Sequence, residues 1–385
     1  MDHGITTKNQ YVMSNDAKTI KFVKKGSPNN PNKYHFKNLV FEGGGVKGIA
    51  YVGALEKLNE RGILQNIERV AGTSAGAMVA VLVGLGYTAK DISDILWDIN
   101  FQNFMDSSWG YIRDIDRLIN DYGWYKGDFF RNLMGGYIKD KTGDSETTFR
   151  QLQAMREKGK PFKDIHLIGT DLSTGYSKVF NADATPDVKI ADAARISMSI
   201  PLFFAAVKGV NGDDHVYVDG GLLDNFAIKV FDRLNYVYDQ ANARRTEYYK
   251  RYNEALAALN DKPKTKRSIT VINEYVYNKE TLGFRLDGQD EIAMFLDPNA
   301  QPKTREIKTL FSYTKILVTT LIDFQNNVHL HTDDWQRTIY IDSLGVSSTD
   351  FNISESTKKD LVEAGRTFTE AYFKWYDNDE EKANK

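Results

Sequence analysis

The chain has 385 residues, enough for one large α/β domain or two ordinary domains. Hydrophobic residues make up 41% of it and charged residues 26%, and the net charge of −2 gives no basic surface for nucleic acid. Because the sequence contains no cysteine, it excludes a disulfide framework, a thiolate metal site and a cysteine nucleophile. The absence of cysteine also fits a reducing compartment.

The two ends of the chain differ in composition from the part between them. Residues 1–36 are polar and rich in lysine and asparagine, which predicts a flexible leader, and residues 377–385 form an acidic tail. The leader lacks the apolar segment of a secretory signal, and no window approaches the roughly 20 apolar residues of a membrane span. We therefore expect a cytoplasmic protein. No convincing linker divides residues 37–376, so we expect a single catalytic domain there.

Apolar runs that end at glycines predict strands, and helical periodicity predicts the helices between them. The predicted strands are 39–41, 67–71, 165–170, 216–218, 269–272 and 338–341. The predicted helices are 49–58, 75–85, 192–199, 231–259, 303–324 and 357–376. This alternation predicts an α/β fold, with a mostly parallel sheet flanked by helices on both faces.

The stretch Gly72-Thr73-Ser74-Ala75-Gly76 stands between a predicted strand and a predicted buried helix. It fits the nucleophile elbow, in which a serine occupies a tight strand-to-helix turn and glycines leave room on both sides. The helix that begins at Ala75 would point the positive end of its dipole at the serine, where an anion is favoured. An ordinary serine-rich turn is the alternative, but the position of the motif favours Ser74 as a nucleophile.

A second glycine-rich turn, Gly43-Gly44-Gly45-Val46-Lys47-Gly48, follows the predicted strand 39–41. Its glycines match the dinucleotide-binding fingerprint, but that motif needs an acidic residue at the end of the next strand, where the elbow stands. A Walker phosphate loop fails because Gly48 follows Lys47 and the spacing is wrong. The remaining role is an oxyanion hole, in which the amides of Gly44 and Gly45 would each contribute roughly 3 kcal/mol.

The identity of the general base is open at this point, because four histidines follow the elbow. His166 lies inside a predicted strand, where an ordinary packing role is favoured. His215 enters the strand that ends at Asp219, so the two residues should lie at its opposite ends. His329 and His331 share one face of an extended segment, but a metal site there would lack a third ligand.

Asp219 is better placed than any of these histidines. It ends a strand that we expect to be parallel, and open α/β sheets place their sites at the carboxyl ends of such strands. Gly220 and Gly221 follow it directly and would let another backbone approach.

Three blocks, Gly43–Gly48, Gly72–Gly76 and Asp219–Gly221, occur here in the order found in the patatin-like phospholipases. The chain resembles that family over roughly residues 38–224, and more weakly up to residue 341. The resemblance implies a Ser/Asp dyad, with Ser74 as nucleophile and Asp219 as general base. It also implies an oxyanion hole lined by Gly43, Gly44 and Gly45. The residues that would support these motifs are Lys47, Gly48, Gly72, Gly76, Gly220 and Gly221. The family often has arginine where this chain has Lys47, which keeps the charge but not the planar fork.

The activity that the resemblance implies is that of a lipid acyl hydrolase, a serine esterase of phospholipase A type. It would cleave fatty-acyl esters of phospholipids through an acyl-enzyme, without a metal or another cofactor. An acyltransferase, a neutral-lipid lipase and a catalytically silent lipid-binding protein are the alternatives. A lipid substrate would make membrane contact transient, and the need for an activator is left open.

Two surfaces are candidates for contact with lipid. The helix predicted at 303–324 carries an apolar stripe, for which a core-facing role is favoured over an interfacial one. The aromatic residues between Trp97 and Phe130 are the better candidate for contact with an acyl chain, although packing of a satellite core is their ordinary role.

Overall fold

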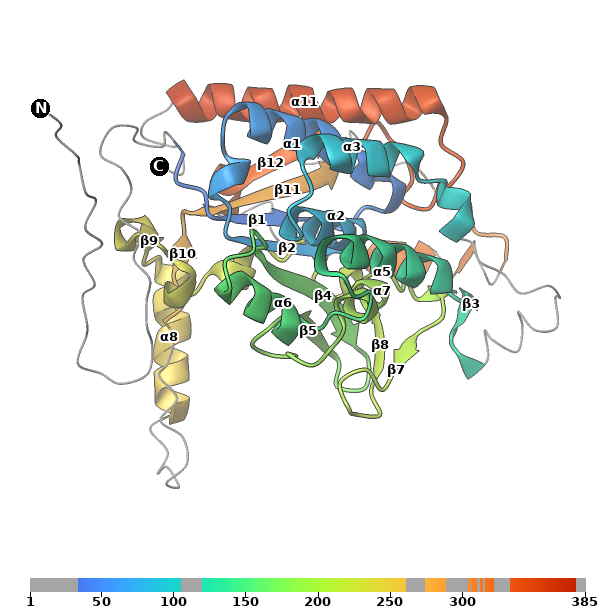
Figure 1. Ribbon diagram of the computed structural model, residues 1–385, viewed down its shortest axis with the longest axis horizontal. Coiled ribbons are helices and arrows are strands. Elements are labelled where there is room, and N and C mark those ends of the chain that lie inside the picture. The colour runs from blue at the N-terminus through green and yellow to red at the C-terminus, as the bar shows by residue number, and fades with distance from the viewer. Residues whose placement is uncertain are drawn as a thin grey trace, which may run out of the picture. The chain divides into compact units, whose positions relative to one another are not determined.

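The computed structural model describes residues 34–104, 120–260, 274–288, 304, 306–309, 312–313, 316–321 and 333–378. The chain divides into two units, Met1–His35 and Phe36–Lys385, and every element below belongs to the second. Its main sheet has eight strands in the order β12-β11-β1-β2-β4-β8-β7, with β5 paired to β4 off this path (Figure 1). The strands are β1 (Asn38–Phe41), β2 (Arg69–Thr73), β4 (Asp164–Asp171), β5 (Tyr176–Phe180), β7 (Val207–Lys208), β8 (Val216–Asp219), β11 (Thr281–Asp287) and β12 (Thr338–Asp342). Two small sheets pair β3 (Gly123–Tyr125) with β6 (Leu202–Phe204) and β9 (Ala243–Arg244) with β10 (Tyr277–Asn278).

The main sheet is parallel over most of its width and antiparallel at one side. The pairs β12–β11, β11–β1, β1–β2 and β2–β4 are parallel, whereas β4–β5, β4–β8 and β8–β7 are antiparallel. The predicted α/β architecture with a mostly parallel sheet is confirmed. The prediction that Asp219 ends a parallel strand is wrong, because β8 runs antiparallel to β4.

The strands β2 and β8 meet β4 along the same edge, one after the other. The opposite edge of β4 is occupied by β5 over residues 167–171. Along the shared edge, β2 ends where Thr73 pairs with Ile168, and β8 ends where Asp219 pairs with Gly169. This arrangement brings together the ends of two strands that are far apart in the sequence.

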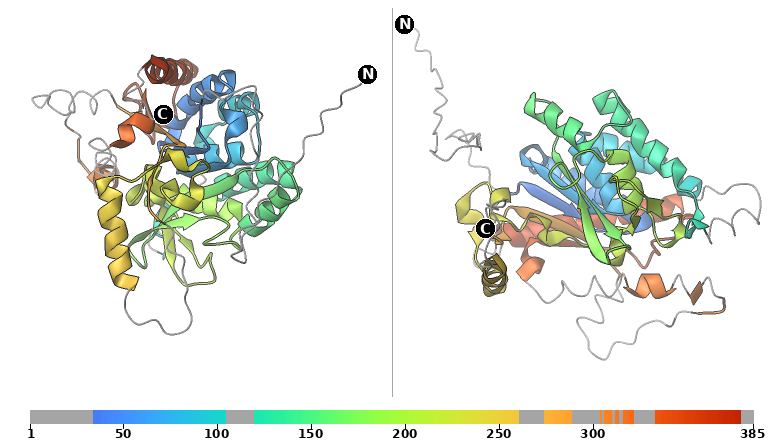
Figure 2. Two further views of the ribbon diagram at one scale, coloured as in Figure 1. Left: turned by 90° about the vertical axis from the view of Figure 1, so that its left-hand side faces the viewer. Right: turned by 90° about the horizontal axis from the view of Figure 1, so that it is seen from below.

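Long helices cover one face of the sheet, and the right-hand view of Figure 2 shows the blue and green ones together on one side of the strands. The helices are α1 (Ala50–Glu60), α2 (Ala75–Gly84), α3 (Ala89–Asp98), α5 (Asp128–Thr142), α6 (Phe149–Glu157), α7 (Ile190–Ser197), α8 (Glu247–Asn260) and α11 (Glu355–Asn378). Every residue of α2 is buried, because this helix lies between the sheet and the helices α3 and α7. Its uniformly apolar sequence follows from that position.

A short segment after β8 covers the opposite face. Phe226, Ile228 and Phe231 pack in one buried cluster with Val40 of β1 and Ala71 of β2. The prediction of a helix over 231–259 is wrong in its first half, where 3₁₀ turns run between residues 228 and 242 and α8 begins only at residue 247. Packing of the apolar side chains on the sheet outweighs the helical propensity of this segment.

Strand β11 is not predicted from the sequence, and the strand predicted at 269–272 lies outside the described residues. Arg285 and Asp287 interrupt the apolar pattern of β11, yet both are buried and their side chains pair at 2.6 Å. A buried strand that contains its own ion pair does not read as an apolar run.

Most of the helix predicted at 303–324 also lies outside the described residues. Of the residues that are described, 312–313 and 316–321 are helical. Tyr313, Leu317 and Leu321 are about half exposed, so a core-facing role is wrong for these three side chains.

The aromatic residues between Trp97 and Phe130 include a packed core. Phe101, Phe104 and Phe130 are buried, and the ring of Phe104 contacts the other two edge-on with centroid distances of 5.8 and 5.6 Å. Trp109 and Tyr111 belong to residues 105–119, which lie outside the described part of the chain. Tyr122, at the far side of that gap, is 49% exposed.

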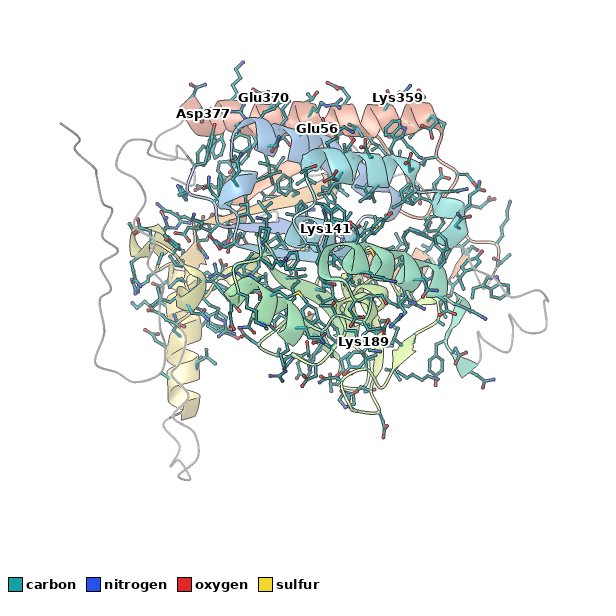
Figure 3. The ribbon with its side chains drawn as sticks, viewed as in Figure 1. Glu56, Lys141, Lys189, Lys359, Glu370 and Asp377 are labelled. Atoms are coloured by element: carbon teal, nitrogen blue, oxygen red, sulfur yellow. The ribbon has the colours of Figure 1, made fainter. Side chains whose placement is uncertain are left out.

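Two glycines allow α1 and α11 to pack closely. A Cβ added to Gly53 of α1 or Gly365 of α11 would lie 2.0 Å from a carbonyl oxygen of the other helix. Glu56 of α1, labelled in Figure 3, forms an ion pair of 2.6 Å with Arg366 of α11 across the same interface. The helices therefore approach to a distance that excludes even a methyl group at these two positions.

Alanine at these glycines should destabilise the fold although alanine is the better helix former. We expect Gly53→Ala and Gly365→Ala each to lower the free energy of unfolding by about 1–2 kcal/mol. The steric clash of the added methyl group outweighs the gain of about 1 kcal/mol that alanine brings through its higher helix propensity. Gly136→Ala in α5 is the control, since its Cβ would meet no atom within 4 Å, and it should raise the stability by about 0.5–1 kcal/mol. Urea denaturation measures all three, and equal stabilisation by all of them would contradict the close packing.

Candidate active site

Ser74 lies on the turn between β2 and α2, and its backbone has the strained geometry expected of an elbow. Its φ is 53° and its ψ is −124°, a conformation that residues other than glycine rarely adopt. Gly76 makes this turn possible, because a Cβ there would lie 2.3 Å from the carbonyl oxygen of Phe41. Ser74 is buried, with 5% of its surface exposed, and stands at the N-terminus of α2.

Helix α7 holds the backbone of Ser74. The N–H of Ser74 donates to Ser197 Oγ at 2.9 Å, and Ser197 Oγ donates in turn to the carbonyl oxygen of Ile168 in β4 at 2.6 Å. The hydroxyl of Ser74 is directed at Met198 Sδ at 3.6 Å. Ser197 thus ties the elbow to the sheet, and the sulfur of Met198 is only a weak acceptor for the hydroxyl of Ser74.

The first glycine turn lies against the elbow. A Cβ built on Gly43 would be 3.0 Å from Ser74 Cβ, and the N–H of Gly43 donates to the backbone oxygen of Asn225 at 3.1 Å. Gly45 has a φ of +56°, and a Cβ there would collide with the carbonyl oxygen of Ser348. Within the described ranges, the amides of Gly44 and Gly45 have no hydrogen-bond partner, so these two remain as donors for a ligand while that of Gly43 is already bonded.

Asp219 ends β8 beside the elbow. Its N–H donates to the backbone oxygen of Ser199 at 2.9 Å, and its Oδ1 accepts the N–H of Gly221 at 2.7 Å. Its other carboxylate oxygen, Oδ2, is buried and has no hydrogen-bond partner among the described residues. A buried carboxylate oxygen without a donor is costly, which is typical of a functional group.

Burial raises the pKa of Asp219 from its usual value to about 7. The amide of Gly221 and the hydroxyl of Ser74 oppose this shift by stabilising the carboxylate. No cation is among the groups that set this pKa, so desolvation dominates it. The sequence alone suggests an ordinary aspartate with a pKa near 4, and the shift comes from the closed environment at the end of β8.

The two described histidines that follow the elbow have partners other than Ser74. His166 is buried on β4, where its Nδ1 lies 3.0 Å from Asn181 Nδ2 and its ring packs against Phe231. His215 Nδ1 lies 2.7 Å from Asp171 Oδ2 at the start of β8. His329 and His331 lie outside the described residues.

The remaining motif residues explain how closely the three blocks pack. A Cβ on Gly48 would lie 2.9 Å from Ala75 Cβ, and one on Gly72 would lie 2.1 Å from the oxygen of Gly76. A Cβ on Gly220 would lie 2.5 Å from the oxygen of Ile168. Gly221 supplies its amide to Asp219, as described above. Lys47 Nζ donates to the backbone oxygen of Leu286 at 3.2 Å, so its charge is directed at β11.

Sequence reasoning missed several residues that hold this site, above all Ser197, Asn225 and Glu42. Asn225 and Glu42 are ordinary polar residues close to a recognised block, whereas Ser197 lies in the helix predicted at 192–199. The contacts of all three depend on strands that meet only in the fold. Asn225 follows the Asp219–Gly221 block by a few residues, and Glu42 directly precedes Gly43. A polar residue beside a glycine motif is the one signal that could have marked Asn225 and Glu42, and Ser197 carries no such signal.

Neither a metal cluster nor a membrane-spanning helix is found in the described residues. No group of three or more histidine, aspartate or glutamate side chains converges there as a metal site. No helix of that part of the chain is both long and apolar enough to cross a bilayer.

Comparison with known proteins identifies the family of the chain. Residues 39–232 match the profile of the patatin-like phospholipase family. The match covers half of the chain, and the chain belongs to this family of lipid hydrolases.

Individual relatives extend the comparison beyond the matched region. The chain is 28% identical to protein YqhO of Bacillus subtilis (strain 168), over 87% of this chain and 97% of that protein. It is 27% identical to 463L of Invertebrate iridescent virus 6, described as a probable lipid hydrolase, over 51% of this chain and 63% of the viral protein. VipD from Legionella pneumophila has a similar fold, with a TM-score of 0.54 and 16% identity over 88% of this chain and 67% of that chain.

The raised pKa of Asp219 makes the stability of the protein depend on pH. Between about pH 4 and pH 7 the unfolded chain ionises at this residue and the folded chain does not, so the free energy of unfolding falls as the pH rises. Asp219→Asn removes this cost, and we expect it to stabilise the protein by at most about 4 kcal/mol at pH 8 and hardly at all at pH 4. Chemical denaturation at the two pH values measures the difference, and a variant less stable than the wild type at pH 8 would contradict the desolvation of Asp219.

Proposed function

We propose that the chain hydrolyses acyl esters of lipids through a Ser74/Asp219 dyad. The observation that supports this most directly is that a strained, buried serine and a buried carboxylate oxygen with no other partner among the described residues come together where β2 and β8 end. The amides of Gly44 and Gly45, which no group in the described part of the chain accepts, lie on the turn beside them. The chain belongs to a family of lipid hydrolases, and this membership supports a lipid ester as the class of substrate.

The reaction follows from these groups. Asp219 Oδ2 takes the proton of Ser74 Oγ as that oxygen attacks the ester carbonyl carbon, and the resulting oxyanion accepts hydrogen bonds from Gly44 and Gly45. When the tetrahedral intermediate collapses, the C–O bond to the alcohol breaks and Asp219 returns the proton to the leaving oxygen. Water then attacks the acyl-enzyme by the same steps and releases the fatty acid.

The environment of Asp219 makes it a better base than an ordinary aspartate. A base is most effective when its pKa lies near the working pH, and burial raises the pKa of Asp219 to about 7. The N-terminus of α2 adds a positive potential at Ser74, where negative charge develops. We infer that the closed site supplies the basicity that a histidine supplies in a Ser-His-Asp triad.

The wider assignment is part of the same proposal. The catalytic domain would run from Phe36, whose buried ring packs on Phe373 and Tyr376, to Asn378 at the end of α11, slightly beyond the predicted bounds 37–376. The residues before it would form a leader and those after it an acidic tail, in a cytoplasmic protein that contacts membranes transiently. An acyltransferase or a neutral-lipid lipase would use the same dyad, and they differ in whether an alcohol or water resolves the acyl-enzyme and in the ester attacked. A silent lipid-binding protein would not need the unpartnered oxygen of Asp219.

The dyad is tested by substitution. We expect Ser74→Ala and Asp219→Asn each to lower the rate of phospholipid hydrolysis at least about 1000-fold, because each removes a group that no neighbour replaces. His215→Ala is the control and should keep its activity within about twofold, since His215 pairs with Asp171. Fatty-acid release from mixed phospholipid vesicles and labelling of Ser74 by a fluorophosphonate are the measurements. A fully active Asp219→Asn protein, or a dead His215→Ala protein, would overturn the dyad.

The pH dependence of the rate tests the role of Asp219 separately. Because the base must be ionised, kcat/KM should rise with pH up to about 7 and level off above it. The profile is measured with a soluble ester whose own chemistry does not change with pH. A rate that is constant from pH 5 to pH 9 would show that Asp219 does not take the proton.

A further inference from the structure

Two buried side chains, Glu42 and Asn225, support the turn that carries Gly44 and Gly45. Asn225 Nδ2 donates to the backbone oxygen of Gly43 at 3.1 Å, and the N–H of Gly43 donates to the backbone oxygen of Asn225 at 3.1 Å. Gly43 is therefore bonded on both sides to one residue of the loop that follows Asp219. This double contact sets the position of the turn relative to that loop.

Glu42 links Asn225 to strand β11 through the two oxygens of its carboxylate. Its Oε1 accepts Asn225 Nδ2 at 3.3 Å, and its Oε2 accepts the N–H of Leu286 in β11 at 2.6 Å. The side chain of Glu42 is fully buried. Each carboxylate oxygen thus faces an N–H donor, one from β11 and one from the loop after β8.

We propose that Glu42 and Asn225 form a positioning clamp that aims the amides of Gly44 and Gly45 at the substrate oxygen. The proposal rests on the dyad mechanism above and adds to it the residues that set the oxyanion donors. Neither side chain touches the reacting atoms. Donors to an oxyanion are effective only within a few tenths of an ångström of the right position, so their support has a direct effect on the rate.

The direction of the hydrogen bonds explains why a carboxylate is needed at Glu42. Glutamine in its place would present one oxygen and one NH₂ group to two donors, so one contact would become repulsive. If the NH₂ group faces Asn225, the amide of Asn225 is driven to turn over and withdraws its donor from Gly43. Replacing one oxygen of Glu42 by an NH₂ group would therefore change the position of the turn.

The charges around Glu42 belong to three elements. Arg285 and Asp287 face it from β11, Lys47 from the glycine turn, and Tyr51 of α1 donates its hydroxyl to the backbone oxygen of Glu42 at 2.7 Å. Burial raises the pKa of Glu42, and Arg285 is the largest opposing influence. Protonation of Glu42 would put an O–H against one of the two N–H donors, so the clamp should weaken at low pH.

A matched pair of substitutions tests the clamp. Glu42→Gln is compared with Glu280→Gln, because Glu280 is also buried and also accepts backbone N–H groups, those of Tyr238 and Asp239, but precedes β11 at the other end. We expect Glu42→Gln to lower kcat about 10–100-fold with KM changed less than about threefold, and Glu280→Gln to keep kcat within about twofold. Equal kcat in wild type and Glu42→Gln would overturn the proposal, as would an equal loss in both variants.

A second variant covers the case in which Glu42→Gln does not fold. Asn225→Ala removes the donor to Gly43 and should lower kcat to a similar extent. In the double variant the two losses should not add, because both residues act through one clamp. Losses that multiply would show that the residues act independently and would overturn the clamp. Wild type should also lose activity more steeply than Glu42→Gln as the pH falls below about 7, because Glu42 ionises in wild type alone.

Hydrogen exchange separates a failure of the clamp from a failure of the dyad mechanism. Measured by mass spectrometry on the peptide that contains Gly43–Gly48, exchange should be about tenfold faster in Glu42→Gln than in wild type and Glu280→Gln. If wild type proves unable to hydrolyse any ester, faster exchange still supports the clamp while the dyad mechanism falls. If wild type is active and exchange is unchanged in Glu42→Gln, the clamp falls and the dyad mechanism stands.

Discussion

The site depends on one topological constraint, which is that β2 and β8 share an edge of β4. A strand edge offers one row of hydrogen-bonding groups, so β8 pairs only where β2 has stopped. The sharp turn at Ser74 directs the chain away from the edge of β4. Strand β8 runs in the opposite direction along the same edge and ends with Asp219 next to the point where β2 ended. The strain at Ser74 and the antiparallel direction of β8 are two aspects of the same arrangement.

The electrostatic properties of the site follow from the exclusion of water by the surrounding packing. Asp219 is desolvated because it is buried where β8 ends against β4 and α7, and no cation lowers its pKa. The same closure makes the amides of Gly44 and Gly45 and the N-terminus of α2 effective, since dipoles act more strongly where water is excluded. Basicity and oxyanion stabilisation thus arise from the same packing, and a change that admits water would weaken both.

Much of the fold and the recognised motifs could be predicted from local pattern. The strand and helix around Ser74, the elbow itself and the glycine turn each need special backbone geometry, and only a few residue types allow it. The direction of β8, the strand β11 and the 3₁₀ turns after β8 could not be predicted, because pairing partners and the buried Arg285–Asp287 ion pair determine them. Likewise, Ser197 and Asn225 acquire their roles through contacts that span more than a hundred residues, which no local window contains.

The position of β11 has a consequence for where the folding unit ends. This strand lies between β1 and β12, and the family profile ends at residue 232, well before it. A fragment cut at that point would leave one edge of β1 unpaired, together with a row of exposed N–H and C=O groups that other chains could join. It would also remove Leu286, whose amide is bonded to Glu42. The segment that identifies the family is therefore shorter than the segment that completes the sheet and supports the glycine turn.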